Sequence, residues 1–159
     1  MKVINYLLGY KDLKIVQDNE MFNFSLDSVL LPNFVTLNKR INKILDIGCG
    51  NAPIPLILST KTKIIGVEIQ EEVYNLAVES IKINKKQEQI QIINKDINDF
   101  YKEQETDSYD VITCNPPFFK YVETSNINKN DYKTIARHEV KLNLENLFLI
   151  AKKLLKNNG

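Results

Sequence analysis

The stretch that decides the fold is "KILDIGCGNAPIPLILST", residues 43–60. "KILDIG" (43–48) predicts a buried strand, and "PIPLILST" (53–60) predicts a helix opened by prolines. Gly48 and Gly50 lie between them and allow a tight turn and a close approach of the backbone to a ligand, since glycine has no Cβ. A strand that turns into a helix through two glycines is typical of nucleotide-binding α/β folds.

Towards the C-terminus, strands and helices alternate. Further strands are expected at 63–69, 90–94 and 110–114, with a helix at 71–85 and a short helical or irregular connection at 96–103. After a polar loop, a last helix at roughly 143–156 has a predicted inner face of Leu144, Leu147, Phe148, Ala151, Leu154 and Leu155. The alternation predicts an α/β fold, with a parallel sheet and right-handed crossovers that place helices on its faces.

Towards the N-terminus, the pattern is less regular. Residues 1–40 are expected to form a helical or extended segment, and residues 41–159 form the core of the same single domain. "FSLDSVLLPNFVTL" (24–37) is typical of a helix, with Ser25 as its N-cap and Asp27 in its first turn.

Composition sets broad limits on the class of protein. The chain has 159 residues, 43% of them hydrophobic, and a formal net charge of +1, so a folded domain without an overall basic character is expected. No apolar run has the length of a membrane span or a secretion signal, so a cytoplasmic location is expected. Cys49 and Cys114 are too few for a zinc site or a disulfide framework, and we predict free thiols and no metal.

The unusual polar residues all follow predicted strands. Asp46, Gly48 and Gly50 end the first strand of the core, Glu68 ends the second, Asp96 follows the third and Asn115 follows the fourth. Because ligands bind beyond the carboxyl ends of parallel strands, these residues are expected on one rim of the sheet.

The rim residues favour a nucleoside ligand. Glu68 lies 20 residues beyond Gly48, where an acid can accept hydrogen bonds from both hydroxyls of a ribose. A dinucleotide fingerprint is disfavoured because Pro53 stands where its last glycine would be. Asp96 fits an acceptor for an exocyclic amine and fits a helix N-cap about equally well, and a purely structural glycine turn remains an alternative.

"NPPF", residues 115–118, fits chemistry on an amine. The side-chain oxygen of Asn115 and a carbonyl held near Pro116 and Pro117 would accept both hydrogens of one NH₂ group. Two such acceptors favour a tetrahedral nitrogen whose lone pair points in one direction. Phe118 offers a flat surface on which a base can stack. Asn115 to Phe118 are therefore the candidate catalytic residues.

In order and spacing, these motifs resemble those of class I S-adenosylmethionine-dependent methyltransferases, which have a Rossmann-like sheet. "NPPF" resembles the members that methylate amines of bases or of glutamine. "FNFSLDSVLLPNF" (22–34) and "IARHE" (135–139) are similar to the bacterial tRNA adenine-N6 methyltransferases, which modify the adenine next to the anticodon of a valine tRNA.

The resemblance implies a role for each motif. S-adenosyl-L-methionine would be the cofactor and tRNA the partner. Among the implied cofactor-binding residues, the glycine turn would hold the methionine part, Glu68 the ribose and Asp96 with Ile97 the adenine. The full set is Asp27, Asp46, Gly48, Cys49, Gly50, Glu68, Ile69, Asp96, Ile97 and Asn115.

Two departures from the family pattern stand out. Ala52 replaces a third glycine, and the chain ends at Gly159, read as a residue that closes the last helix, before the family's later strands. We therefore expect the sheet to lack its last strands and the chain to be a fragment of a longer enzyme. Transfer to guanine N2 in rRNA or to a release-factor glutamine, and a noncatalytic cofactor- or RNA-binding remnant, remain alternatives.

Overall fold

The computed structural model describes residues 1–21, 24–60, 62–116 and 144–159. Its centre is a parallel sheet of four strands: β3 (Lys43–Ile47), β4 (Lys63–Glu68), β5 (Ile90–Asn94) and β6 (Val111–Cys114). The strand order is β5-β4-β3-β6. The chain therefore places β4 and then β5 on one side of β3, and afterwards places β6 on the other side. This order confirms that the strand before Asn115 lies beside the strand before the glycine turn. The switch in direction at β3 is where parallel sheets bind ligands.

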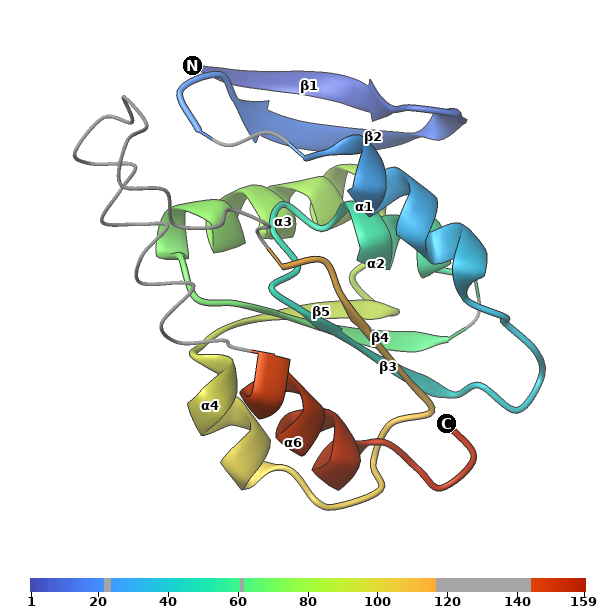
Figure 1. The fold of residues 1–159 in the computed structure, drawn as a ribbon. Helices are drawn as coiled ribbons and strands as arrows, with labels where there is room; N and C mark the ends of the chain where they lie inside the picture. The colour runs from blue at the N-terminus through green and yellow to red at the C-terminus, as the bar shows by residue number, and fades with distance from the viewer. Residues whose placement is uncertain (22–23, 61, 117–143) are drawn as a thin grey trace.

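Helices cover both faces of the sheet, as the alternation predicts (Figure 1). One face carries α1 (Leu26–Leu30), the 3-10 helix η1 (Leu31–Phe34), α2 (Pro53–Leu58) and α3 (Glu71–Ile83). The other carries α4 (Ile97–Phe100), the 3-10 helix η2 (Tyr101–Glu103) and α6 (Leu144–Leu154). Because β3 is buried on both sides, it reads as a nearly continuous apolar run, with Ile44, Leu45 and Ile47 at most 1% exposed.

The predicted inner face of the last helix is partly wrong. Ile150 and Leu154 are its buried residues, whereas Leu144 and Phe148 are each 65% exposed. The helix also ends at Leu154, because the backbone then turns to pair with the segment that precedes β6. Leu155 bridges Tyr109, and Lys156 N donates to the Tyr109 carbonyl at 2.9 Å. Gly159 is therefore not the residue that closes this helix.

The N-terminal segment forms a β-hairpin, which the sequence predicted only as helical or extended chain. The hairpin pairs β1 (Lys2–Leu7) with β2 (Tyr10–Asp18) and turns at Gly9, whose φ is 81°. In Figure 1 the hairpin lies over the helical layer that contains α1 and α3. It thus adds a further layer above the sheet on the side of the glycine turn.

The helix predicted at 24–37 is shorter than expected. Only Leu26–Leu30 is α-helical, and the chain continues as a 3-10 turn because Pro32 has no N–H for the α-helical ladder. Ser25 occupies the N-cap position with extended φ and ψ angles, as predicted, but its hydroxyl makes no capping hydrogen bond.

Two features of the described residues bear on the class of protein. None of the helices they form is long and apolar enough to cross a membrane. Over the same residues, no group of three His, Cys, Asp or Glu side chains is placed to hold a metal ion.

Candidate active site

The turn after β3 has left-handed backbone at alternating positions. The φ angles are 66° at Gly48, 57° at Gly50 and 73° at Ala52. Glycine adopts this conformation without strain, whereas alanine pays a steric penalty of about 1 kcal/mol. Ala52 therefore takes the backbone conformation that a third glycine would take, and the turn needs support from its neighbours.

The support comes mainly from β4. The N–H groups of Gly48 and Cys49 both donate to the Val67 carbonyl, at 2.9 and 3.1 Å. The Gly50 N–H donates to Glu68 Oε2 at 3.1 Å. These three bonds fix the turn over the carboxyl end of β4.

Glu68 lies beneath this turn and is only 4% exposed. Its second oxygen, Oε1, accepts from the Gln70 N–H at 2.9 Å. The carboxylate therefore supports the glycine turn, a role that the sequence did not predict. Each oxygen of a carboxylate can accept more than one hydrogen bond, so this position is compatible with the predicted contact to a ribose.

Asp46 is the most buried acid of the rim, at 1% exposure. Its Oδ1 accepts a 2.6 Å hydrogen bond from the Thr113 hydroxyl of β6, while Oδ2 has no hydrogen-bond partner among the described residues. Burial raises the pKa of Asp46 to about 7; the Thr113 hydrogen bond opposes this rise, and the charge of Glu68 adds to it. A buried carboxylate with one unsatisfied oxygen is suited to a cationic or hydrogen-donating ligand.

Both cysteines are free, as predicted. Cys49 is buried in the turn, and burial, with the charges of Asp46 and Glu68, raises the pKa of its thiol well above the ordinary value. Burial raises the pKa of Cys114 to about 12. Both thiols are therefore neutral at physiological pH and contribute apolar packing rather than a nucleophile.

Asp96 acts as the N-cap of α4, one of the two roles left open. Its Oδ1 accepts from the Asn98 N–H at 2.9 Å and from Asn98 Nδ2 at 3.0 Å. Ile97 is 8% exposed and packs in the core between the sheet and α6, so little of it faces solvent. Ile69 is half-buried directly after β4. All three lie at the same edge of the sheet as Glu68, as the predicted adenine site requires.

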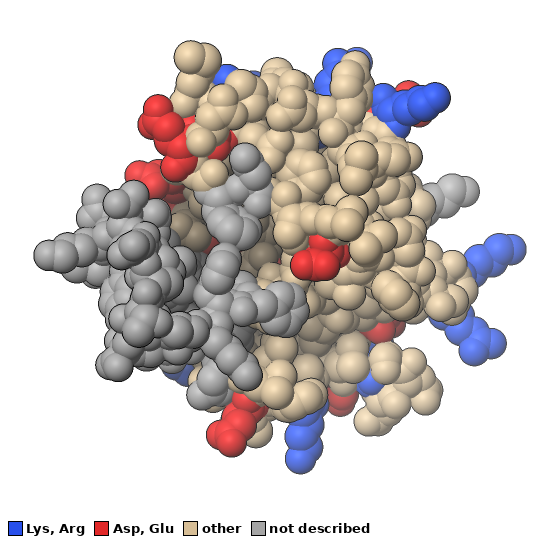
Figure 2. All heavy atoms as spheres, turned by 45° about the horizontal axis from the view of Figure 1, so that its top comes forward, with Lys and Arg blue, Asp and Glu red and all other residues tan. Residues whose placement is uncertain are grey.

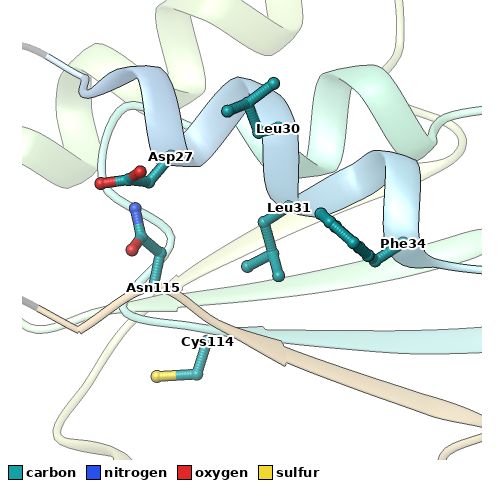
Figure 3. Close-up of a pocket in the computed structure, with 6 residues that line it drawn as sticks. All are labelled: Asp27, Leu30, Leu31, Phe34, Cys114 and Asn115. Atoms are coloured by element: carbon teal, nitrogen blue, oxygen red, sulfur yellow. The ribbon is translucent and has the colours of Figure 1, made fainter.

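Asn115 follows β6 and reaches towards α1. Its Nδ2 donates to the Ser28 hydroxyl at 2.9 Å and to the Ser25 hydroxyl at 3.5 Å. Figure 3 shows Nδ2 pointing to α1 and Oδ1 pointing away from it. Within the described part of the chain, no donor is hydrogen-bonded to Oδ1. The two serines therefore orient the amide so that its oxygen is presented as an acceptor.

A cavity of about 350 Å³ adjoins this amide. Figure 3 shows the side chains of Asp27 and Asn115 approaching one another at one end of the cavity. Apolar side chains and a thiol form the remaining lining: Leu30, Leu31, Phe34 and Cys114. The combination of apolar walls with two polar groups at one end is typical of a site for a planar, partly polar molecule.

Two residues of this site were missed by the sequence analysis. Thr113, which binds Asp46, and Ser28, which orients Asn115, are both buried. A polar residue within the apolar strand "VITC" was the available signal for Thr113. Pro116 is half-buried after β6. The other predicted residues of the motif, Pro117 and Phe118, lie outside the described residues, as do the polar loop and "IARHE".

Two basic residues near the core, Lys43 and Lys86, lie away from the rim. Lys43 begins β3, at the opposite end of the sheet, and its ammonium lies 4.5 Å from the centre of the Tyr109 ring. Lys86 donates to the Ser59 carbonyl at 3.1 Å. Figure 2 shows the described Lys and Arg side chains scattered around the periphery of one face, with uncharged surface and several Asp and Glu side chains between them. Lys43 and Lys86 therefore support the fold.

The parallel sheet, the glycine turn and the acids at its carboxyl edge define a Rossmann-like methyltransferase fold. Residues 14–142 match the methyltransferase small domain, and the chain belongs to that family. The tRNA1(Val) (adenine(37)-N6)-methyltransferase of Flavobacterium psychrophilum is 31% identical over 156 residues, which are 96% of this chain and 65% of the relative. The enzyme of the same name from Photorhabdus laumondii is 30% identical over 94% of this chain and 61% of its own length. The chain thus spans less than two thirds of these relatives.

Solved structures support the same fold. TYW2 of Pyrococcus horikoshii, in complex with MeSAdo, superimposes with a TM-score of 0.64 at 18% identity, over 98% of this chain and 48% of that one. Trm5 of Methanocaldococcus jannaschii, in complex with adenosine, gives a TM-score of 0.54 at 20% identity, over 89% of this chain and 39% of that one. At these identities, the likeness concerns the fold alone.

Proposed function

We propose that this chain carries the cofactor and amine sites of an S-adenosylmethionine-dependent methyltransferase that modifies the N6 amine of an adenine in tRNA. The observation that carries the proposal is the orientation of Asn115: Ser28 holds its Nδ2, and its Oδ1 is left as an acceptor at the rim of the sheet. The name that the two relatives share supports adenine in a valine tRNA as the target. The two solved neighbours bound to MeSAdo and to adenosine support a nucleoside cofactor.

The residues of the rim fit S-adenosylmethionine. Asp46 offers an unsatisfied buried oxygen that suits a cationic group, and Glu68 offers carboxylate oxygens beneath the turn for a ribose. Gly48 and Gly50 have open space where a Cβ would lie, so the backbone of the turn is accessible to a ligand. When bound, the cofactor supplies an activated methyl group.

The chain itself contributes orientation rather than a strong base. Asn115 Oδ1 accepts one hydrogen of the target amine, and a backbone carbonyl near Pro116 accepts the other. With both hydrogens held, the nitrogen lone pair is less delocalised into the ring and points in one direction. The neutral thiol of Cys114 and the leucines of the cavity wall supply an apolar surface beside that position.

Two measurements test the proposal. Calorimetry of this chain with S-adenosylmethionine is expected to show binding, and transfer of a tritiated methyl group is expected with unmodified valine tRNA. Asn115→Ala is expected to abolish transfer and keep cofactor binding, while Asn42→Ala, at the opposite end of the sheet, leaves both unchanged. Transfer to rRNA or to a release factor, with none to tRNA, would mean that the proposed substrate is wrong while the proposed chemistry stands. Absence of cofactor binding would refute the proposed function.

A further inference from the structure

The free edge of β2 is paired with side chains rather than with another strand. The Lys14 N–H donates to Asn84 Oδ1 at 2.9 Å, and Asn84 Nδ2 donates to the Lys14 carbonyl at 2.5 Å. Two residues further on, the Val16 N–H donates to the Ser80 hydroxyl at 2.9 Å. Ser80 and Asn84 are one helical turn apart on α3, so their spacing matches alternate residues of the strand. Helix α3 thus holds the hairpin through two polar side chains.

The remaining polar group of Val16 is bound by the glycine turn. Asn51 Nδ2 donates to the Val16 carbonyl at 2.9 Å, in a buried contact between residues far apart in the sequence. Asn51 is 7% exposed and stands between Gly50 and Ala52, two of the three left-handed positions of the turn. Val16 of β2 therefore connects two elements. Its N–H is bound to α3, and its carbonyl is bound to the glycine turn.

This contact fixes a side of the turn that β4 does not reach. Gly48, Cys49 and Gly50 are bound to β4 through their N–H groups, whereas Asn51 is bound to the hairpin through its side chain. Because Ala52 holds an unfavourable backbone conformation, the turn depends on its anchors to keep that conformation. The hairpin anchor lies directly before that residue.

We propose that Asn51 is a positioning residue: by bonding to Val16 it holds the glycine turn in the conformation that binds the cofactor, and it makes the N-terminal hairpin part of the cofactor site. The effect on cofactor affinity rests on the proposed function. The effect on the turn itself does not, because it follows from contacts within this chain.

The test compares two variants, each of which removes one of the two hydrogen bonds that Val16 makes to residues outside the hairpin. Asn51→Ala removes the contact to the turn, and Ser80→Ala removes the contact to α3 on the other side of the same residue. Hydrogen exchange of the Gly48, Cys49 and Gly50 amides, measured without ligand, is expected to be about tenfold faster in Asn51→Ala than in Ser80→Ala. The dissociation constant for S-adenosylmethionine, measured by calorimetry, is expected to rise about tenfold in Asn51→Ala only.

Asn51→Asp provides an isosteric second variant. Its ionised carboxylate cannot donate to the Val16 carbonyl, but the protonated acid has an O–H that can. Because position 51 is buried, the pKa of the introduced carboxyl is expected to lie above its ordinary value of about 3.9. Fast exchange relative to the wild type at pH 8 is therefore expected to diminish as the pH is lowered towards 4, after correction for intrinsic exchange rates, and Asn51→Ala shows no such recovery.

The exchange measurements decide the role of Asn51, and the binding measurement decides the proposed function. Equal effects of Asn51→Ala and Ser80→Ala on the turn amides would mean that Asn51 only attaches the hairpin, and would overturn the inference. Wild-type exchange in Asn51→Ala would also overturn it. Failure of the wild-type chain to bind S-adenosylmethionine would instead refute the proposed function, while the exchange measurements would still decide the role of Asn51.

Discussion

Replacing Asp46 by asparagine tests the electrostatics of the site most directly. Asp46 is buried, its Oδ2 has no partner among the described residues, and burial raises its pKa from the ordinary 3.8 to about 7. Asparagine has nearly the same shape and keeps an oxygen that can accept from Thr113. The substitution therefore removes the charge with little change in packing.

The expected magnitude follows from the two pKa values. Because the folded state holds the proton more tightly than the unfolded chain, the stabilisation is complete below pH 3.8 and is lost as the pH rises through about 7. Each pH unit between the two values is worth about 1.4 kcal/mol. The wild-type chain should therefore lose ~4 kcal/mol relative to Asp46→Asn between pH 4 and pH 8.

Urea denaturation of both proteins, followed by circular dichroism between pH 4 and pH 8, measures this difference. Other titrating groups are common to both proteins and cancel in the comparison. Thr113→Val, which keeps Asp46 but removes its hydrogen bond, should move the pH-dependent range upward because that bond lowers the pKa. A difference between wild type and Asp46→Asn that stays constant across this pH range would refute the reasoning.

The remaining predictions concern packing, orientation and an ion pair. Gly66→Ala should lower stability by about 1–3 kcal/mol in urea denaturation, because its Cβ would lie 2.8 Å from Ile92 Cδ1. Adding Ile92→Val should restore part of this loss, and effects of the two substitutions that simply add would contradict this. Ser28→Ala should reduce kcat of methyl transfer with little change in cofactor affinity, because Asn115 loses its orienting acceptor; unchanged kcat would argue against that role. The pKa of Asp110 is lowered because hydrogen bonds outweigh its burial, so its stabilisation is present above pH 3.8 and is lost as the pH falls through the lowered pKa. Asp110→Asn should thus destabilise at pH 7 and progressively less as the pH falls below 3.8, and a pH-independent effect would refute this.

The strands and the glycine turn could be predicted because their signals are local. The apolar runs of β3 and β4 mark buried parallel strands, and Gly48 and Gly50 mark the turn between strand and helix. The adjacency of β3 and β6 followed from the topology of such sheets, which placed Asn115 beside the turn. These parts of the fold depend little on contacts between distant residues.

The parts that were missed depend on such contacts. The hairpin has few local signals, and its free edge is held by Asn84 and Ser80 of a distant helix. The helix α6 has apolar residues on more than one side, so the sheet rather than periodicity selects Ile150 for burial. Ser28 gains its role only when α1 packs beside the end of β6, which no pattern in "FSLDSVLL" encodes.

Ala52, with its left-handed backbone, limits which residues can occupy its position. Position 52 is fully enclosed, so a longer side chain would have to displace its neighbours while also adopting an unfavourable backbone angle. Replacement by glycine is the substitution that satisfies both conditions. In a library of all single replacements, position 52 should therefore tolerate only two residue types, which makes it one of the least variable sites in the domain.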